Sequence, residues 1–188
     1  MVASVSIKSN TIQISKEIQN IQKQFPAKIK QILANVSASQ LRRIRLRTEK
    51  GKSVSGSPFT PYSTKPFFFN TNPEGQPRYK FFEGGYREFR GSKGRSTKPD
   101  LNFRGNMLSA MTTKVSSDKA SLFFRRQEEN KKAFFHDIKG AGKGRVVRPF
   151  FSINNKEEDL ILKEFAIKIE KILKWVKEKL LQVMLSQY

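Results

Sequence analysis

The C-terminal part of the chain repeats apolar side chains at a helical period, and this feature constrains the fold most. Apolar residues recur three and four positions apart, which indicates an amphipathic helix with one buried face. Asn155 and Glu158 form a capping-box pattern at its start. We expect the helix to reach about Leu185, roughly 45 Å at 1.5 Å per residue. Such a helix is long for 188 residues, so we expect its end to pack against another chain. The stripe consists of Ile161, Phe165, Ile169, Ile172, Val176, Leu180 and Val183.

A second helical pattern lies in the N-terminal part. Apolar or small residues recur at the same steps from Ile29 to Thr48, and Gly51 is a typical helix terminator. Pro26 has no N–H group, so it either kinks an earlier helix or opens a new one. Residues 4–14 partly alternate between apolar and polar side chains, which predicts a short edge strand or hairpin.

The chain is strongly basic, with 37 Lys and Arg against 16 Asp and Glu, a formal net charge of +21. Such a charge attracts polyanions and repels other copies, so a homo-oligomer must bring acidic groups to its interfaces. Arginines on the polar face of the N-terminal helix are either solvated or pair with phosphates or carboxylates. A glycine-rich loop near residue 140 adds further cations. The candidate contacts for DNA or an acidic partner are Arg42, Arg43, Arg45, Arg47, Lys143, Arg145 and Arg148.

Residues 51–100 form a loop-rich insert in which aromatic side chains alternate with cations. A long loop within a compact domain is unusual unless it is functional. Because exposed aromatic rings are costly in water, they either fill the edge of this domain's core or anchor on a neighbour. Stacking on single-stranded nucleic acid is a less specific alternative. The candidate inter-subunit anchors are Phe67, Phe68, Phe69, Tyr79, Phe81, Phe82, Tyr86 and Phe89.

The remaining segments predict a mixed fold. Residues 108–115 and 120–126 read as a β-hairpin, and a short helix over 128–137 should turn Ala133 and Phe134 inward. Residues 146–153 have an extended pattern, and the proline at position 149 either places this strand at a sheet edge or makes it short. We therefore expect a single α+β domain over residues 1–188. It has a small, mostly antiparallel sheet, a long N-terminal helix, a long C-terminal helix packed across the sheet, and the aromatic insert.

No pattern in the sequence calls for catalysis. His136 is the only histidine, cysteine is absent, and no acidic cluster has metal-ligand spacing. A Gly-x-Ser-x-Gly nucleophile elbow is also missing. We therefore expect no enzymatic activity, cofactor, metal or small-molecule substrate. No apolar run reaches the roughly 18 residues of a membrane span, and the N-terminus lacks a secretory pattern, so we expect no membrane partner and no export.

Three short motifs occur in order along the chain: residues 56–63 (Gly-Ser-Pro-Phe-Thr-Pro-Tyr-Ser), residues 101–109 and residues 148–151 (Arg-Pro-Phe-Phe). This order, followed by a long helix, resembles the head–tail neck and tail-completion proteins of tailed bacteriophages, also called virion morphogenesis proteins. The resemblance covers roughly residues 25–185. The sequence departs from the family pattern at Arg104, where the family favours Thr, and in the long basic segment 67–98. The second motif contains Leu101, Gly105, Met107, Leu108 and Ser109.

The resemblance implies a structural virion protein that forms a ring at the head–tail junction, in a neck, tail-completion or tail-terminator position. Such rings commonly contain six or twelve copies and join connector and tail around the DNA channel. The partners would be the portal, adaptor or head-closure protein and the tail-tube or tail-terminator proteins, with packaged DNA as a further contact. The protein would be synthesised in the host cytoplasm and reside in the virion. The alternative is a basic nucleic-acid-binding protein that acts as a monomer or dimer.

Overall fold

The computed structural model describes residues 8–142 and 144–185, with side-chain environments from residue 12 onward. Its class is α+β, as the sequence predicts: two long helices pack together, beside two small antiparallel hairpins and clusters of aromatic rings. The chain divides into two compact units. The first contains the chain up to residue 40, residues 113–122 and the C-terminal helix, and the second contains residues 41–112 and 123–154.

The N-terminal helix α1 runs from Lys8 to Glu49 and passes through Pro26 without ending. The strand predicted over residues 4–14 is therefore wrong for residues 8–14, and the rest of it lies outside the described residues. The spacing of Ile14, Ile18 and Ile21 also fits a helix, and this period continues into the packed part of α1. The helical period, which extends over many turns, outweighs a short alternating pattern.

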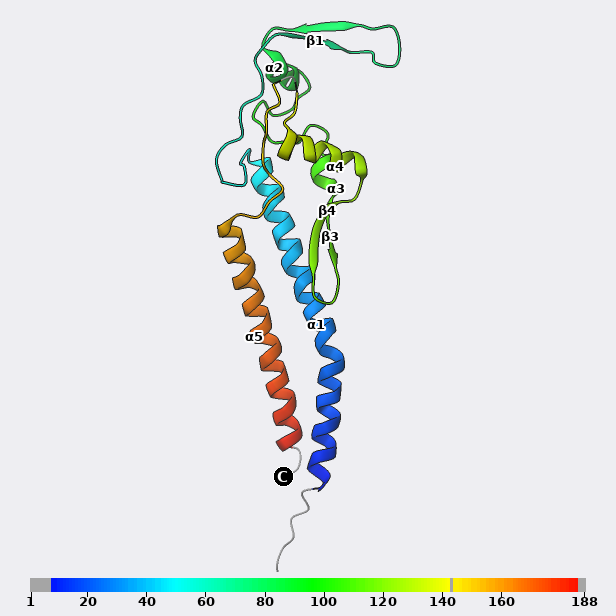
Figure 1. The fold of residues 1–188 in the computed structure, drawn as a ribbon, viewed down its shortest axis with the longest axis vertical. Coiled ribbons are helices and arrows are strands. Elements are labelled where there is room, and N and C mark those ends of the chain that lie inside the picture. The colour runs from blue at the N-terminus through cyan, green and yellow to red at the C-terminus, as the bar shows by residue number, and fades with distance from the viewer. Residues whose placement is uncertain (1–7, 143, 186–188) are drawn as a thin grey trace, which may run out of the picture. The chain divides into compact units, whose positions relative to one another are not determined.

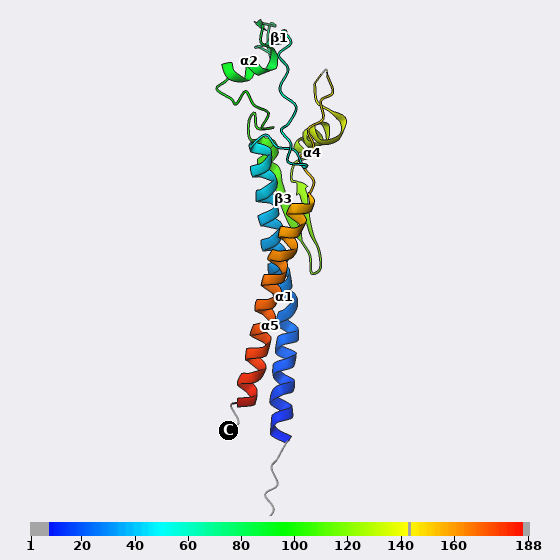
Figure 2. The ribbon, with the colours of Figure 1, turned by 90° about the vertical axis from the view of Figure 1, so that its left-hand side faces the viewer.

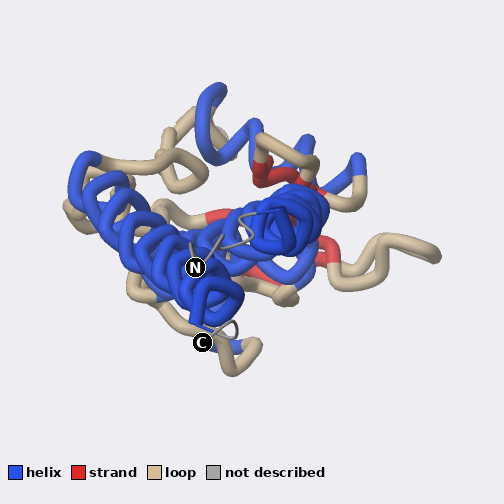
Figure 3. Tube along the Cα trace, turned by 90° about the horizontal axis from the view of Figure 1, so that it is seen from below, coloured by secondary structure: helices blue, strands red, loops and turns tan. Residues whose placement is uncertain are grey.

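Helices α1 and α5 (Asn155–Leu185) run antiparallel, with the start of α1 and the end of α5 at the same end of the pair (Figures 1 and 2). Ser39 Oγ donates to Glu164 Oε1 at 3.0 Å, and the Lys28 ammonium lies 4.1 Å from the centre of the Trp175 ring. Figure 3 shows the same two helices from below, close to end-on. The C-terminal helix thus packs on α1, and not across a sheet as expected. The contact buries Ile32, Val36 and Ile172, with Ile29, Ile161, Phe165, Ile169, Trp175 and Val176 packed around them.

Gly51 ends α1 through a Schellman motif, as its position in the sequence predicts. The Lys52 N–H donates to the Arg47 carbonyl at 3.0 Å, and the Gly51 N–H donates to the Thr48 carbonyl at 2.9 Å. Gly51 has a φ of +72°, and a Cβ atom there would lie 2.6 Å from the Pro99 carbonyl oxygen. This position therefore requires glycine both for its backbone conformation and for the close approach of another segment.

Two separate two-stranded hairpins replace the single small sheet that the sequence predicts. β1 (Phe67–Asn70) pairs with β2 (Tyr79–Phe82), and β3 (Met111–Val115) pairs with β4 (Ala120–Phe124). The hairpin predicted near residues 116–119 is confirmed, but its first strand begins later than expected. Residues 106–110 instead form the short helix α3 (Asn106–Ala110), which follows Gly105 at a φ of +79°.

Three short helical segments complete the fold: α2 (Gly85–Ser92), α4 (Gln127–Phe134) and the π-helix η1 (Phe135–Lys139). Ala133 is buried as predicted, but Phe134 is exposed, because the inward face of α4 carries Glu129 and Ala133, and Phe134 lies about 100° farther around the helix. The extended segment after η1 forms one isolated bridge, between Ala141 and Val146, and no longer strand within the described residues. The loop-rich insert is thus partly ordered into β1, β2 and α2.

Candidate docking surface on the aromatic hairpin

The β1–β2 hairpin has two aromatic faces with different surroundings. Its register pairs Phe67 with Phe82 and Phe68 with Phe81, and the next two pairs continue this order towards the tip. Since successive side chains of a strand point to opposite faces, these two pairs lie on opposite sides of the hairpin. We call the Phe67–Phe82 side the inner face and the Phe68–Phe81 side, which includes Tyr79, the outer face.

The inner face packs against α2 through Phe89. The Phe89 ring centroid lies 4.5 Å from that of Phe69, 5.3 Å from that of Phe82 and 5.7 Å from that of Phe103. Phe82 and Phe89 are both almost fully buried. Aromatic pairs at these separations contribute about 0.5–1.5 kcal/mol each beyond the burial of their area. The hairpin is therefore held to α2 by rings on one side only.

The outer face is exposed. Phe68 and Tyr79 are each 67 % exposed, and Phe81 is 51 % exposed. The rings of Phe68 and Phe81 pack on each other across the strands, with centroids 4.9 Å apart. An exposed group of large aromatic side chains is typical of a protein–protein contact, because each ring buries about 150–250 Å² when a partner covers it.

The loop that joins the two strands is fixed by its own polar side chains. Asn70 Oδ1 accepts hydrogen bonds from the backbone N–H groups of Asn72 and Arg78, at 3.0 and 3.1 Å. Thr71 Oγ1 donates to the Arg78 carbonyl, and Asn72 Nδ2 donates to the Gln76 carbonyl. These bonds hold the tip of the hairpin in one conformation. The outer face is thus formed before any partner binds, which lowers the entropic cost of docking.

A buried arginine holds the segment after α2 in place. Arg90 is 1 % exposed, its Nη2 donates to Asp100 Oδ1 at 2.8 Å, and its Nε donates to the Ser96 carbonyl at 2.7 Å. Its guanidinium carbon also lies 4.6 Å from the centre of the Tyr62 ring. Burial raises the pKa of Tyr62 above its ordinary value, although the charge of Arg90 opposes this shift. Asp100 Oδ1 also accepts the Asn102 N–H at 2.9 Å, which closes an Asx-turn.

The predicted basic contacts have different surroundings. Arg45 donates to the carbonyls of Leu108, Ser109 and Met111, and Arg47 donates to those of Phe150 and Ser152. Arg148 is buried, donates to the carbonyls of Thr60 and Pro61, and has a pKa that burial lowers. Arg42 and Arg145 are exposed, Arg43 is half-buried, and Lys143 lies outside the described residues. The sequence does not separate these arginines from one another. In the structure, the guanidinium groups of Arg45, Arg47 and Arg148 donate to backbone carbonyls.

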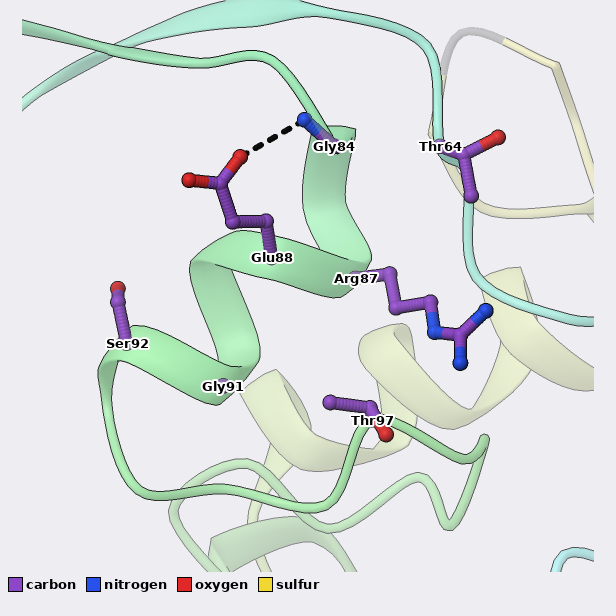
Figure 4. A pocket seen from close by; sticks show the side chains of 7 residues that line it. All are labelled: Thr64, Gly84, Arg87, Glu88, Gly91, Ser92 and Thr97. Carbon is purple, nitrogen blue, oxygen red and sulfur yellow. Dashed lines mark hydrogen bonds between the residues drawn. The ribbon is translucent and has the colours of Figure 1, made fainter.

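A hollow of about 500 Å³ lies beside α2, and Figure 4 shows its lining. The Glu88 carboxylate at its edge accepts the Gly84 N–H at 2.7 Å, so this acid already caps the helix. The Arg87 side chain extends between Thr64 and Thr97. The lining of the hollow offers one cation, one carboxylate and three hydroxyl groups. It is lined by Thr64, Gly84, Arg87, Glu88, Gly91, Ser92 and Thr97.

His136 is half-buried, and its backbone carbonyl accepts the Arg148 N–H at 2.7 Å. Its burial, followed by the charge of Arg148, lowers the pKa of His136. Within residues 8–142 and 144–185, no three His, Asp or Glu side chains gather in a group that could hold a metal ion. None of the helices formed by these residues is both long and apolar enough to cross a membrane.

Comparison with family models, with curated proteins and with solved structures finds no match.

Proposed function

We propose that this chain is a structural virion protein that assembles as a ring at the head–tail junction of a tailed bacteriophage, and that the outer face of the β1–β2 hairpin docks it onto a neighbouring subunit or ring. The observation that carries the proposal is the exposed pair of Phe68 and Phe81 on a hairpin whose tip is already fixed. The order of the sequence motifs supports the phage assignment. The role is binding and assembly, without a catalytic step.

The chemistry of the outer face suggests the kind of surface it meets. Lys80 belongs to the inner face, because it alternates with Phe81 on β2 and its ammonium lies 5.3 Å from the centre of the Phe82 ring. The outer face is thus formed by the rings of Phe68, Tyr79 and Phe81 without a cation from β1 or β2. Exposed rings bind best to an apolar pocket, in which they act as buried anchors. The high positive charge of the chain as a whole favours an acidic surface around that pocket. We therefore propose that the partner surface is apolar at its centre and acidic at its edge. Such a partner also overcomes the repulsion expected between copies with a net charge of +21.

The second candidate is a nucleic-acid-binding protein, and the net charge favours it. For that function, the logarithm of the DNA affinity should fall steeply and linearly with the logarithm of the salt concentration. The arginines at positions 45, 47, 90 and 148 donate to backbone carbonyls, and Arg90 also to Asp100, so they add little to a DNA-binding surface. The exposed cations that remain include Arg42 and Arg145.

Mass photometry tests the two candidates against each other. The purified protein is measured alone, with a portal–connector preparation from the same phage, and with duplex DNA at physiological ionic strength. The proposal predicts ring-sized species with the viral partner and weak DNA binding. A protein that stays monomeric with the portal–connector preparation, and binds duplex DNA tightly, contradicts it and supports the second candidate.

A further inference from the structure

The hollow beside α2 brings together polar side chains that have no partner within the protein. Figure 4 shows the Arg87 side chain extending between Thr64 and Thr97, and all three residues are exposed. Among the residues that the structure describes, none forms a hydrogen bond or an ion pair with the Arg87 guanidinium or with either threonine hydroxyl. One cation and two hydroxyl groups are therefore available to a ligand in this hollow.

The backbone of Thr64 is fixed against the start of α2. The Arg87 N–H donates to the Ser63 carbonyl at 3.1 Å. A Cβ atom at Gly85 would lie 2.6 Å from the carbonyl oxygens of both Ser63 and Lys65, so the segment passes directly over this glycine. These contacts use backbone atoms, and they leave the Thr64 hydroxyl free.

The backbone of Thr97 is fixed by its neighbours in the chain. Arg90 Nε donates to the Ser96 carbonyl at 2.7 Å, and Ser96 Oγ accepts the Lys98 N–H at 3.1 Å. A Cβ atom at Gly91 would meet Thr97 Cγ2 at 3.5 Å, so Thr97 lies next to α2. Both threonines are thus held beside Arg87 before a ligand binds, which lowers the entropic cost of binding.

The chemistry of these groups favours an oxyanion with several oxygen atoms. A guanidinium group binds two oxygens of a phosphate or a carboxylate at once. A terminal phosphate has further oxygens for the two hydroxyls, whereas a carboxylate has none left. Rotation about the Cα–Cβ bonds of the exposed threonines turns their hydroxyls towards the guanidinium. Residues 91–98, along one side of the hollow, carry three cations and no acid, and this charge attracts a phosphate.

Glu88 is the acidic residue of the lining, and it determines which part of the hollow the phosphate occupies. Its carboxylate points away from Arg87 and accepts the Gly84 N–H at 2.7 Å. A phosphate beside Glu88 would be repelled, so the phosphate lies at the Arg87 end. The volume of about 500 Å³ lies within the range of about 300–1,000 Å³ that is typical of ligand sites. The remainder of the hollow therefore has room for an organic group.

We propose that the hollow beside α2 binds the terminal phosphate of a phosphate monoester. The Arg87 guanidinium contacts two phosphate oxygens, the hydroxyls of Thr64 and Thr97 donate to the phosphate, and the organic part of the ligand extends along α2. An internal phosphodiester of a nucleic acid has only two free oxygens and fits these donors less well. The inference uses the hollow alone, so it does not depend on the virion assignment.

Titration with methyl phosphate and with dimethyl phosphate tests the site. The NMR signal of the Arg87 Nε–H group is followed at fixed pH and ionic strength. Methyl phosphate should shift this signal to saturation, and dimethyl phosphate should bind at least about tenfold more weakly, because it has fewer free oxygens and less charge. A shift that does not saturate, or equal affinity for the two compounds, overturns the proposal.

Substitutions test the three donors, with the Thr97 amide as the NMR probe. Arg87→Met should weaken methyl phosphate binding at least about tenfold, and Thr64→Val, which keeps the shape of the side chain, about threefold or more. Arg42→Met removes the same charge from an exposed position of α1 and should leave the affinity unchanged. Circular dichroism checks that each variant is folded. Unchanged affinity in Arg87→Met, or an equal loss in Arg42→Met, overturns the proposal.

Further ligands distinguish the possible sources of the phosphate. Adenosine monophosphate represents a small molecule, and a short DNA duplex with 5′-phosphates, compared with the same duplex without them, represents a DNA end. The true source should bind more tightly than methyl phosphate, because its organic part fills the remainder of the hollow. If neither does, the proposed place for an organic group is wrong. Phe68→Ala should leave phosphate binding unchanged, so failure of the docking proposal is distinguishable from failure of this one.

Discussion

The helix pair and the aromatic region satisfy their backbone polar groups in different ways. In α1 and α5 nearly every backbone N–H and carbonyl group bonds within its own helix. Side chains are therefore free to form the contact between the two helices, which is centred on Ile32 and Ile172. Residues 51–154 form short elements with many irregular connections, and there side chains satisfy the backbone. Four arginines donate to nine backbone carbonyl oxygens in this region: Arg45, Arg47, Arg90 and Arg148.

This difference changes how the high positive charge is interpreted. A buried guanidinium that donates to several carbonyls stabilises an irregular segment, because an unpaired buried carbonyl costs about 1–3 kcal/mol. Part of the basic composition therefore serves the fold of the aromatic region. The net charge of +21 overstates the surface that is available to a polyanion.

The largest expected effect separates the inner from the outer aromatic face. Phe89→Ala removes a ring that packs on Phe69, Phe82 and Phe103, and should lower the free energy of unfolding by about 3–5 kcal/mol. Phe81→Ala, on the outer face, should change it by no more than about 0.5 kcal/mol. Urea denaturation followed by circular dichroism measures both. Equal losses would show that the two faces do not differ as described.

The next effect tests whether an arginine supports the aromatic region. Arg90→Met removes the cationic partner of Asp100 and the donor to the Ser96 carbonyl, so the variant should lose about 3 kcal/mol of unfolding free energy. Arg87→Met removes an exposed arginine from the same helix and should be nearly neutral. If both variants unfold at the same urea concentration as the wild type, buried guanidinium groups do not stabilise this region.

A smaller effect is expected in the helix pair, whose buried centre is aliphatic. Ile172→Ala should cost about 2–3 kcal/mol, because the two helices can close part of the cavity. Ile167→Ala makes the same chemical change at an exposed position of α5 and should cost less than about 1 kcal/mol. Thermal unfolding monitored at the helical circular dichroism band compares the two. A larger loss at Ile167 would mean that α5 packs on α1 through the other side.

The smallest effect is pH dependence from His136, in the aromatic region. Its pKa in the folded protein is below the ordinary value of 6.5, so the unfolded chain binds a proton more readily as the pH falls. Stability should therefore be complete above about pH 6.5 and decrease as the pH drops towards the folded pKa. His136→Gln should remove this part of the slope. The difference between the two denaturation curves, measured from pH 7 to about pH 5, should shrink towards acid pH; a constant difference would contradict the assignment.

The sequence predicted the long elements better than the short ones. The apolar period from Ile161 to Val183 and the glycine at position 51 were sufficient for α5 and for the end of α1. The β1–β2 hairpin was missed because three successive phenylalanines show no alternation, and only the structure shows which ring faces α2. Buried arginines were also missed, because the identity of a basic residue does not tell whether its guanidinium meets water or a carbonyl. The sequence also does not show which of the candidate anchors are exposed, because filling the edge of the core and docking on a neighbour both fit the aromatic pattern.

The central claim is that the rings of the outer face are not needed for folding but are needed for assembly. One paired measurement tests this claim most directly. The double variant Phe68→Ala and Phe81→Ala is compared with Phe134→Ala and Phe135→Ala, two neighbouring phenylalanines that are also exposed. Each protein is unfolded in urea and, separately, mixed with the portal–connector preparation and imaged by electron microscopy. We predict that both variants unfold like the wild type, and that only the Phe68/Phe81 variant fails to join the assembly. Normal assembly by that variant, with its rings removed, would contradict the account.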